Sequence, residues 1–250
     1  MGTELKVILS DLQLPYHHVK AIDAVCGFLA DQSNRIVEVH QVGDFFDFCA
    51  ISSFSAGTPL EDGKDLQREI DVAEQVMLKI GKAYPGLKTR IKGNHDDRLN
   101  RYLATRARGL AGLRSLDYDT LTLAREYGWE TKPEPYKVAP TTQVVHGLAV
   151  RARAGYTAHA HMERLAGNIV HGHTHRAAIV YRTVGSNTRW AMEVGSLMDR
   201  RKAFYLPAGG LADWQMAIGA LYIDGNDTWP VLMEIKSDGS FVFEGRRYRP

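Results

Sequence analysis

The sequence predicts an α/β fold in which two sheets pack together and helices cover their outer faces. Two observations favour this fold class: the first half alternates β-rich apolar runs with amphipathic helices, and the second half consists mostly of strands. The chain has 250 residues, of which 44% are hydrophobic and 24% charged, a composition that excludes disordered, collagen-like and coiled-coil proteins. It shows neither internal repeats nor a linker-like tract, so we expect a single domain over residues 1–250.

The first half is expected to form a parallel sheet. Apolar residues recur at helical spacing over 19–29 and 66–84, between the first three strands. A strand–helix–strand–helix–strand order is typical of parallel α/β structure. The five strands expected up to residue 170 are 5–9, 36–42, 87–91, 143–145 and 168–170.

The second half is expected to be rich in strands with few helices. A helix is predicted over 156–165. Asp238 and Gly239 form a turn signal between two apolar runs, which predicts a hairpin there. The expected strands are 177–184, 189–194, 213–223, 229–235 and 240–248.

Composition also limits the location and the partners of the protein. The longest apolar stretch, 217–223, is much shorter than the ~18–20 residues of a membrane helix, and the first residues lack a signal sequence. We therefore expect a cytoplasmic protein without membrane association. Cys26 and Cys49 lie in apolar contexts typical of buried thiols. The net charge of +2 is too small for a protein that wraps nucleic acid, although it allows a local basic patch.

Each of the five early strands is followed by residue types that bind metal ions. The carboxyl ends of strands in an open α/β sheet face the crevice where ligands bind, so these loops are expected to converge on one site. Six of the ten histidines fall between positions 146 and 175. In chain order, the residues are Asp11 and Gln13, then Asp44 and Asp47, then Asn94 and His95, then His146, and finally His173 and His175.

This series resembles the calcineurin-like metallophosphoesterase superfamily. The pattern of that superfamily is Asp-x-His, Gly-Asp-x-x-Asp, Gly-Asn-His-Asp/Glu, a lone His and Gly-His-x-His, and it is matched in this order from Asp11 to His175. The resemblance implies a four-layer α/β/β/α sandwich of two mixed sheets flanked by helices, which agrees with the two sheets expected from the strand pattern.

The resemblance also implies a binuclear metal centre and its ligands. One ion would be held by Asp11, Gln13, Asp44 and His175, and the other by Asp44, Asn94, His146 and His173. His95 would donate a hydrogen bond or a proton to the leaving oxygen, and Asp47 would orient the His95 imidazole. Two such ions acidify a bridging water and clamp the phosphoryl oxygens. The mixed ligand set favours Mn, with Fe, Zn, Co or Ni as alternatives.

Gln13 departs from the superfamily pattern, which has histidine at this position. A neutral amide oxygen is a weaker ligand for a transition metal than imidazole, so the first ion is expected to be weakly held, with some preference for a harder cation such as Mn. His17 or His18 offers an imidazole nearby, although both are expected to be loop residues before the first helix. A noncatalytic scaffold with a degenerate metal site is the alternative, but His95 and Asp47 serve chemistry rather than folding, which favours an enzyme.

Basic residues suggest which substrate the site accepts. Residues 88–114 contain eight basic and two acidic side chains, and a helix over 97–113 would place Arg98, Arg101 and Arg108 on one face. This face is either a solvated helix surface or a surface that steers phosphate. We assign Arg98, and Arg176 directly after His175, as substrate-binding candidates.

The predicted function is a binuclear metal-dependent phosphodiesterase that hydrolyses nucleotides, cyclic nucleotides or short nucleic acid through a metal-bridging hydroxide. A phosphomonoesterase or protein phosphatase of the same superfamily is the alternative. Ser/Thr phosphatases carry arginine after the second motif, whereas Phe48 follows Asp47 here. His159 and His161 are left out of the metal site, because residues two apart on a helix do not face the same way.

Overall fold

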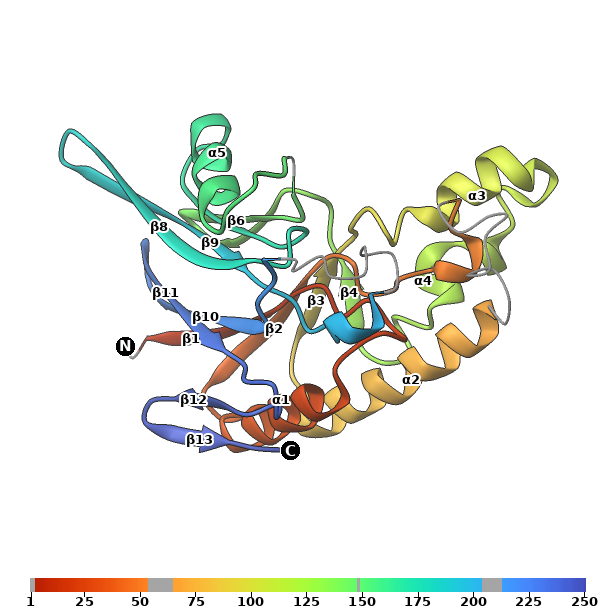
Figure 1. The fold of residues 1–250 in the computed structure, drawn as a ribbon, viewed down its shortest axis with the longest axis horizontal. Helices are drawn as coiled ribbons and strands as arrows, with labels where there is room; N and C mark the ends of the chain where they lie inside the picture. The colour runs from red at the N-terminus through yellow and green to blue at the C-terminus, as the bar shows by residue number, and fades with distance from the viewer. Residues whose placement is uncertain (1–2, 54–64, 148, 204–212) are drawn as a thin grey trace.

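Two mixed sheets packed face to face form the centre of the molecule. The computed structural model describes residues 3–53, 65–147, 149–203 and 213–250. The first sheet has the strand order β11–β10–β1–β2–β3–β4 and the second the order β5–β6–β7–β9–β8 (Figure 1). The first sheet consists of β1 (Glu4–Leu9), β2 (Ile36–Val42), β3 (Lys88–Ile91), β4 (Trp129–Thr131), β10 (Ala217–Asp224) and β11 (Asp227–Glu234). The second consists of β5 (Tyr136–Ala139), β6 (Thr142–Val145), β7 (Asn168–His171), β8 (Ala177–Val184) and β9 (Asn187–Val194).

Helices cover the outer face of each sheet. Figure 1 shows α1 and α2 along one side of the molecule and α5 on the other, while α3 projects at one end. The described α-helices are α1 (Val19–Asp31), α2 (Leu66–Ala83), α3 (Arg98–Arg106), α4 (Tyr118–Leu121) and α5 (Tyr156–Arg164). Short 3₁₀ helices are η1 (Cys49–Ile51), η3 (Arg108–Leu110), η4 (Arg114–Leu116) and η5 (Arg200–Lys202).

Three hydrophobic clusters separate the four layers. Alternate residues of a strand point to opposite faces, so Val7 of β1 packs with the α1 and α2 side chains whereas Ile8 packs between the two sheets. On the second sheet, Val170 faces the first sheet and Ile169 faces α5. This alternation confirms the predicted four-layer α/β/β/α sandwich.

Strand direction places the metal-binding motifs at one end of the sheets. β1, β2, β3 and β4 run parallel, as do β6, β7 and β9 in the second sheet. The strands β10 and β11 add antiparallel to the edge of the first sheet, and β5 and β8 add antiparallel to the edges of the second. The parallel core predicted for the first half is therefore confirmed.

The hairpin predicted at Asp238 is wrong, because the strands on the two sides of this turn do not pair with each other. The turn forms, with Gly239 at φ +88°, but β11 is followed by a separate two-stranded sheet of β12 (Phe241–Phe243) and β13 (Arg246–Tyr248). The aromatic side chains of this sheet pack edge-on against Phe28 of α1 at centroid distances of 5.0–5.6 Å. β12 therefore packs its aromatic side chains on α1 and pairs with β13 rather than with β11. The single strand expected over 240–248 is accordingly two short ones.

The helix predicted over 97–113 is shorter than expected. α3 ends at Arg106, and the 3₁₀ helix η3 follows. Leu99 and Leu103 are buried, whereas Leu110 and Leu113 are each 49% exposed. Because helices gain most of their stability from packing an apolar face, the unpacked second half of the stripe does not continue the helix. Short strands β4 and β5 are additions that the sequence pattern did not predict.

The remaining predictions can be compared directly. Cys26 and Cys49 are both buried, as expected, and neither forms a disulfide within the described residues. Among the described residues, none of the helices is both long and apolar enough to cross a membrane. The predicted helix over 156–165 is α5, and its His159 and His161 have different surroundings, because His161 is fully buried and His159 is exposed.

Candidate metal centre

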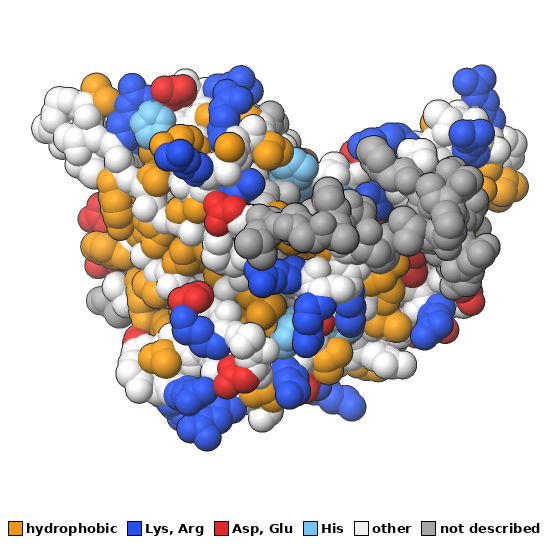
Figure 2. All heavy atoms as spheres, viewed as in Figure 1, with side chains coloured by type: hydrophobic (Ala, Val, Ile, Leu, Met, Phe, Trp, Pro, Cys, Tyr) orange, Lys and Arg blue, Asp and Glu red, His pale blue; other side chains and the backbone are white. Residues whose placement is uncertain are grey.

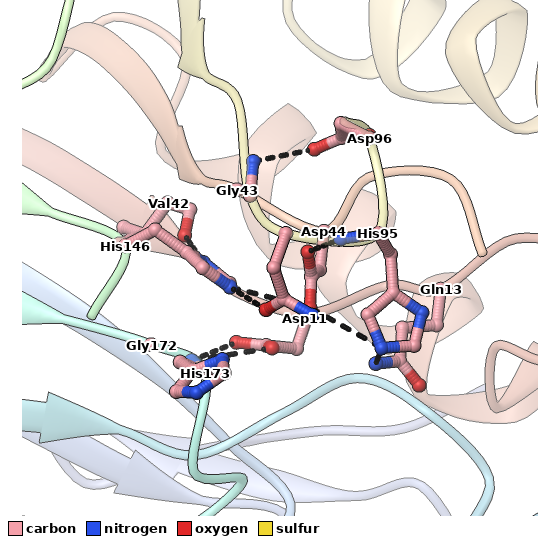
Figure 3. Close-up of polar contacts among 12 residues, drawn as sticks. Asp11, Gln13, Val42, Gly43, Asp44, His95, Asp96, His146, Gly172 and His173 are labelled. Atoms are coloured by element: carbon pink, nitrogen blue, oxygen red, sulfur yellow. Dashed lines mark hydrogen bonds and ion pairs between the residues drawn. The ribbon is translucent and has the colours of Figure 1, made fainter. Parts of the chain in front are cut away.

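The predicted ligands come together at the carboxyl ends of five strands. Asp11 and Gln13 follow β1, Asp44 follows β2, and Asn94 follows β3. His146 follows β6, and His173 and His175 follow β7 in the second sheet. Figure 3 shows Asp11, Asp44, His146 and His173 facing a common space from separate loops. The centre therefore lies where the ends of the two sheets meet.

One group of ligands is compact. Single ligand atoms of Asp44, His146 and His173 lie within 4.8 Å of one another. Oδ2 of Asp44 is 3.2 Å from Nε2 of His146, and Oδ1 of Asn94 is 3.1 Å from the same nitrogen. These four residues are the set that the superfamily resemblance implies for one ion, and the structure brings them together.

A second group contains Asp11, Gln13 and His175. Nε2 of His175 lies 3.3 Å from Oδ1 of Asp11 and 3.2 Å from Nε2 of Gln13. The Oε1 atom of Gln13 is buried, and no hydrogen-bond partner for it lies within the described ranges. An unpartnered buried oxygen at this position is consistent with an atom that coordinates a cation.

The backbone of the ligand loops is strained. Left-handed φ angles are uncommon for residues other than glycine and persist where the surrounding structure enforces them, often at functional sites. The ligands with such angles are Asp11 (φ 44°), Gln13 (44°), Asp44 (52°), His173 (71°) and His175 (58°). Backbone strain concentrated at these residues supports a functional role for the cluster.

Two glycines leave room for the carboxylates. A Cβ on Gly93 would collide with the side chain and backbone of Asp44, and a Cβ on Gly172 would collide with Ser10 and Asp11. Glycine is therefore required beside each aspartate because of close approach. This explains why the asparagine and histidine motifs each begin with glycine.

The charges of the compact group favour a cation. Burial by itself raises the pKa of Asp44, but the imidazoles of His146 and His95 outweigh it and hold this pKa well below its usual value. Burial lowers the pKa of His146, yet Asp44 raises it to about 10. The cluster thus stabilises one positive charge beside Asp44, and a bound divalent cation would replace that proton.

The surroundings of His173 favour the neutral imidazole, which is the form that binds a metal ion. Burial and the neighbouring His146 lower the pKa of His173. Its Nδ1 atom is buried and has no hydrogen-bond partner among the described residues. Carboxylate, imidazole and amide donors together suit a divalent first-row metal ion, so the residues present fit the cation that this fold implies.

His95 stands beside this cluster with a carboxylate behind it. Its backbone N–H donates to Oδ1 of Asp44 at 2.8 Å, and its Nδ1 lies 3.0 Å from Oδ2 of Asp47. Its Nε2 lies 3.8 Å from Oδ2 of Asp44 and therefore points toward the cluster. The predicted His95–Asp47 pair is thus in contact, in the geometry that fixes an imidazole tautomer.

Arg98 is bonded to Asp47, whereas the sequence analysis assigned it to substrate binding. Its Nη1 donates to the carbonyl oxygen of Asp47 at 2.8 Å and to Oδ1 of the same residue at 2.9 Å. Its Nη2 is 3.3 Å from Nε2 of His95. The guanidinium therefore holds Asp47 in position, and its charge is already balanced by that carboxylate.

Arg176 also forms an ion pair, although its buried Nε makes no hydrogen bond within the described residues. Its Nε lies 3.5 Å from Oδ2 of Asp213, and its side chain is largely buried. His18 caps α1, because its Nδ1 accepts a hydrogen bond from the N–H of Ala21 at 3.1 Å. His17 is buried outside the compact group, with its pKa lowered by burial to about 4. Both histidines precede the first helix, as expected.

Asp96 is a functional residue that the sequence analysis missed. Its fully buried carboxylate accepts hydrogen bonds from the N–H groups of Gly93, Phe45 and Phe46 and from the hydroxyl of Tyr118. It thereby ties the loop after β2 to the loop after β3. The available signal was its position directly after His95, where the pattern of the resembled superfamily has Asp or Glu.

Glu193 holds the final histidine loop in the same way. This fully buried carboxylate of β9 accepts from the hydroxyl of Thr174, between the two ligand histidines, and from the N–H of Gly155 at 2.6 Å. Nothing in its local sequence, Met192 to Val194, marks it as part of the site.

Comparisons with known proteins agree with this fold and relate the chain to two phage proteins. No protein-family model matches the chain. Vps29 of Chaetomium thermophilum superposes with a TM-score of 0.50 over 98% of both chains at 9% sequence identity, a likeness that shows the shared metallophosphoesterase-like fold alone. The Gene 54 protein of Mycobacterium phage L5 is 32% identical over 250 residues, covering 96% of each chain. The Gene 54 protein of Mycobacterium phage D29 is 32% identical over 249 residues, again covering 96% of each. The chain belongs to the family of these phage Gene 54 proteins.

Proposed function

We propose that the chain is a metal-dependent phosphodiesterase acting on nucleotides, cyclic nucleotides or short nucleic acid. The observation that carries the proposal is the compact group of Asp44, His146 and His173, with the His95–Asp47 pair directed at it. A scaffold without activity would need neither a strained ligand cluster nor an oriented histidine. The metallophosphoesterase-like fold supports the coarser conclusion, a metal-dependent phosphoesterase.

The proposed centre holds two divalent ions, with Mn preferred. Asp44, Asn94, His146 and His173 would hold one, and Asp11, Gln13, Asp44 and His175 the other. When bound, divalent ions supply Lewis-acid polarisation of the phosphoryl oxygens and activation of the attacking water. The Gln13 position makes the second group the weaker of the two, because an amide oxygen is a poorer ligand than imidazole for Mn, Fe or Zn.

The protein side chains then handle the leaving group. Asp47 accepts from Nδ1 of His95, which leaves Nε2 as the nitrogen that faces the cluster. A proton held at this Nε2 would pass to the departing ester oxygen. Arg98 keeps Asp47 in place and so fixes the direction of the imidazole.

The paired arginines near the centre and the basic side chains farther away both support a diester substrate over a monoester. A monoester dianion is usually recognised by free arginine near the metals, but Arg98 and Arg176 are both paired with carboxylates. A diester instead extends away from the centre over the surface. Figure 2 shows lysine and arginine side chains on the lobes on both sides of a hollow, one around α3 and one around α5, where further phosphates would lie.

The test compares a diester with a monoester under metal supplementation. Purified protein, stripped of metal and titrated with Mn²⁺, is assayed on bis-p-nitrophenyl phosphate and on p-nitrophenyl phosphate. We expect Mn²⁺-dependent hydrolysis with the larger kcat/KM for the diester. Asp44→Asn should abolish it, while Asp97→Asn, a change of an exposed aspartate on the neighbouring loop after β3, should not.

Each other outcome selects an alternative. A larger kcat/KM for the monoester would make the protein a phosphomonoesterase. Tight Mn²⁺ binding without hydrolysis of either ester would make it a noncatalytic metal-binding scaffold. Hydrolysis that is indifferent to Asp44→Asn would remove the assigned centre from the reaction.

A further inference from the structure

A pocket of about 320 Å³ lies where β10 begins and β11 ends, and one of its lining residues, Trp214, contacts the predicted ligand His175. Its walls come from the end of the loop before α1, from η5, from the segment that leads into β10, and from the turn after β11. The volume lies at the lower end of the range for small-molecule sites. Its lining residues include Trp214, Met216, Ile235, Arg200 and Ser237.

Trp214 connects this pocket to the metal centre. Its ring lies 4.3 Å from the ring of His175, centroid to centroid, at an interplanar angle of 57°. The next residue, Gln215, donates its N–H to the carbonyl oxygen of His175 at 2.8 Å. The segment that carries the indole is therefore attached directly to a predicted ligand.

The far wall of the pocket lies within the length of a nucleotide from the loop that carries Asp11 and Gln13. β11 lies two strands from β1 in the first sheet, and neighbouring strands are about 4.8 Å apart, so the far wall of the pocket is about 10 Å from the loop after β1. A group held at the metal centre and a group held in the pocket can therefore belong to one small molecule.

The walls suit a flat, apolar ring with polar edges. Trp214 is half-buried and supplies an aromatic surface, while Met216 and Ile235 supply apolar contacts. The polar lining includes Ser237, Arg200 and two carboxylates, Asp199 and Glu234, which are paired with Arg201 and Lys236. Arg201 is paired with Asp199 through two hydrogen bonds of 2.8 and 2.9 Å, so Arg200 is the rim cation without a carboxylate partner in the described part of the chain.

We infer that this pocket binds the nucleobase of a nucleotide whose phosphate lies at the metal centre. The inference rests on the proposed function and narrows its substrate class from phosphodiesters in general to nucleotides. Bases stack on aromatic side chains through their π faces, and such a stack typically strengthens binding by at least about fivefold. Trp214 is then a specificity-determining residue rather than a catalytic one.

The experiment measures what the base adds to binding. Isothermal titration of the Mn²⁺-loaded protein gives Kd for the four ribonucleoside 5′-monophosphates and for ribose 5-phosphate, which shares their sugar and phosphate but lacks the base. The base advantage is the ratio of Kd for ribose 5-phosphate to Kd for a nucleotide. We expect a ratio of at least about five for the unchanged protein.

Variants assign this advantage to the pocket. Trp214→Ala should reduce the ratio to about one, whereas Trp214→Phe should restore most of it, because a phenyl ring still stacks. Any damage that Trp214→Ala does to His175 weakens both ligands and cancels in the ratio. Tyr181→Ala, which removes an exposed aromatic ring of β8, should leave the ratio unchanged.

A second variant guards against a folding defect at Trp214. Ser237→Phe adds bulk at an exposed position of the rim and should also reduce the ratio to about one. A ratio near one in the unchanged protein, or a ratio indifferent to Trp214→Ala and Ser237→Phe, would overturn the inference. Failure of the proposed function would appear separately, as absent hydrolysis of bis-p-nitrophenyl phosphate.

Discussion

At the residue scale, His95 has different partners on its two ring nitrogens. Nδ1 contacts Asp47, while Nε2 faces Oδ2 of Asp44 at 3.8 Å and lies within 3.4 Å of the Gln13 amide. Its contact with the compact group is made by the backbone N–H, which donates to Asp44. The imidazole is thus placed to act on a substrate without being needed to hold a metal.

His95→Ala should separate metal binding from catalysis. We expect the variant to keep its Mn²⁺ and to lose about 10²- to 10⁴-fold in kcat, the usual contribution of a positioned acid or base. Metal content by plasma mass spectrometry and kcat on a diester provide the two readouts. His159→Ala, at an exposed histidine of α5, is the control. Loss of metal in proportion to rate would make His95 a ligand instead.

Gln13→His should tighten the weaker ligand group. The Gln13 side chain already lies 3.2 Å from Nε2 of His175, so an imidazole at this position reaches the same space with a stronger donor. The variant should retain more Mn²⁺ through gel filtration and reach half-maximal activity at a lower Mn²⁺ concentration. Gln67→His, on the exposed face of α2, adds an imidazole far from the site and should change neither measurement. Coincident titration curves for Gln13→His and the unchanged protein would show that Gln13 is not a ligand.

At the scale of elements, the site depends on loops that are joined by buried carboxylates. Asp96 joins the loops after β2 and β3, and Glu193 joins β9 to the loop after β7. The ligands are held by these joints, because each loop is short and carries left-handed residues that strain it. Burial and the nearby Asp44 raise the pKa of Asp96, whereas its hydrogen bonds from Gly93, Phe46 and Tyr118 act in the opposite direction.

Asp96→Ala should destabilise the protein and loosen the metal site together. The change leaves the buried N–H groups of Gly93, Phe45 and Phe46 without an acceptor, which should cost about 3 kcal/mol or more of the free energy of unfolding. Urea denaturation measures this loss, and Mn²⁺ titration measures the weaker binding. Asp97→Ala removes the exposed neighbour and should change the stability by less than about 0.5 kcal/mol. Equal effects of the two substitutions would contradict the role assigned to Asp96.

At the scale of the whole molecule, a buried polar network links the two sheets at the end away from the metal centre. Nζ of Lys6 donates to Oε2 of Glu38 at 2.7 Å in the first sheet and to the carbonyl oxygen of Val138 at 2.8 Å in the second. His40 lies in this network, stacked on Tyr136 with ring centroids 4.9 Å apart. Burial lowers the pKa of His40 to about 4.

The stability of the fold should therefore fall in mild acid. Below about pH 6.5 the unfolded chain takes up a proton at His40 that the folded chain refuses until about pH 4, so the free energy of unfolding decreases as pH falls through this window. The full loss from this one group is about 3 kcal/mol. Urea denaturation across the window measures it, and His40→Gln should flatten the curve by that amount. An unchanged pH dependence in His40→Gln would show that His40 is not a source of the effect.

Much of the fold was predictable because its signals are local. Helical spacing of apolar residues predicted α1 and α2 to within about two residues at each end, and β2 and β8 begin and end as expected. β4 and β5 have three and four residues, too few for a periodic pattern to stand out. The pairing of β12 with β13 depends on Phe28, more than 200 residues earlier in the chain, and so left no local signal.

The sequence by itself determined that the metal-binding motifs meet, because each follows a strand and the carboxyl ends of parallel strands share one edge. It also determined which residue types are available there, including the amide of Gln13. Only the tertiary structure decided how the surrounding charges are used: Arg98 is paired with Asp47, and Asp96 joins two loops. It also decided that Trp214 lies against His175. These are contacts between distant segments, and their partners are set by how the layers pack rather than by any pattern along the chain.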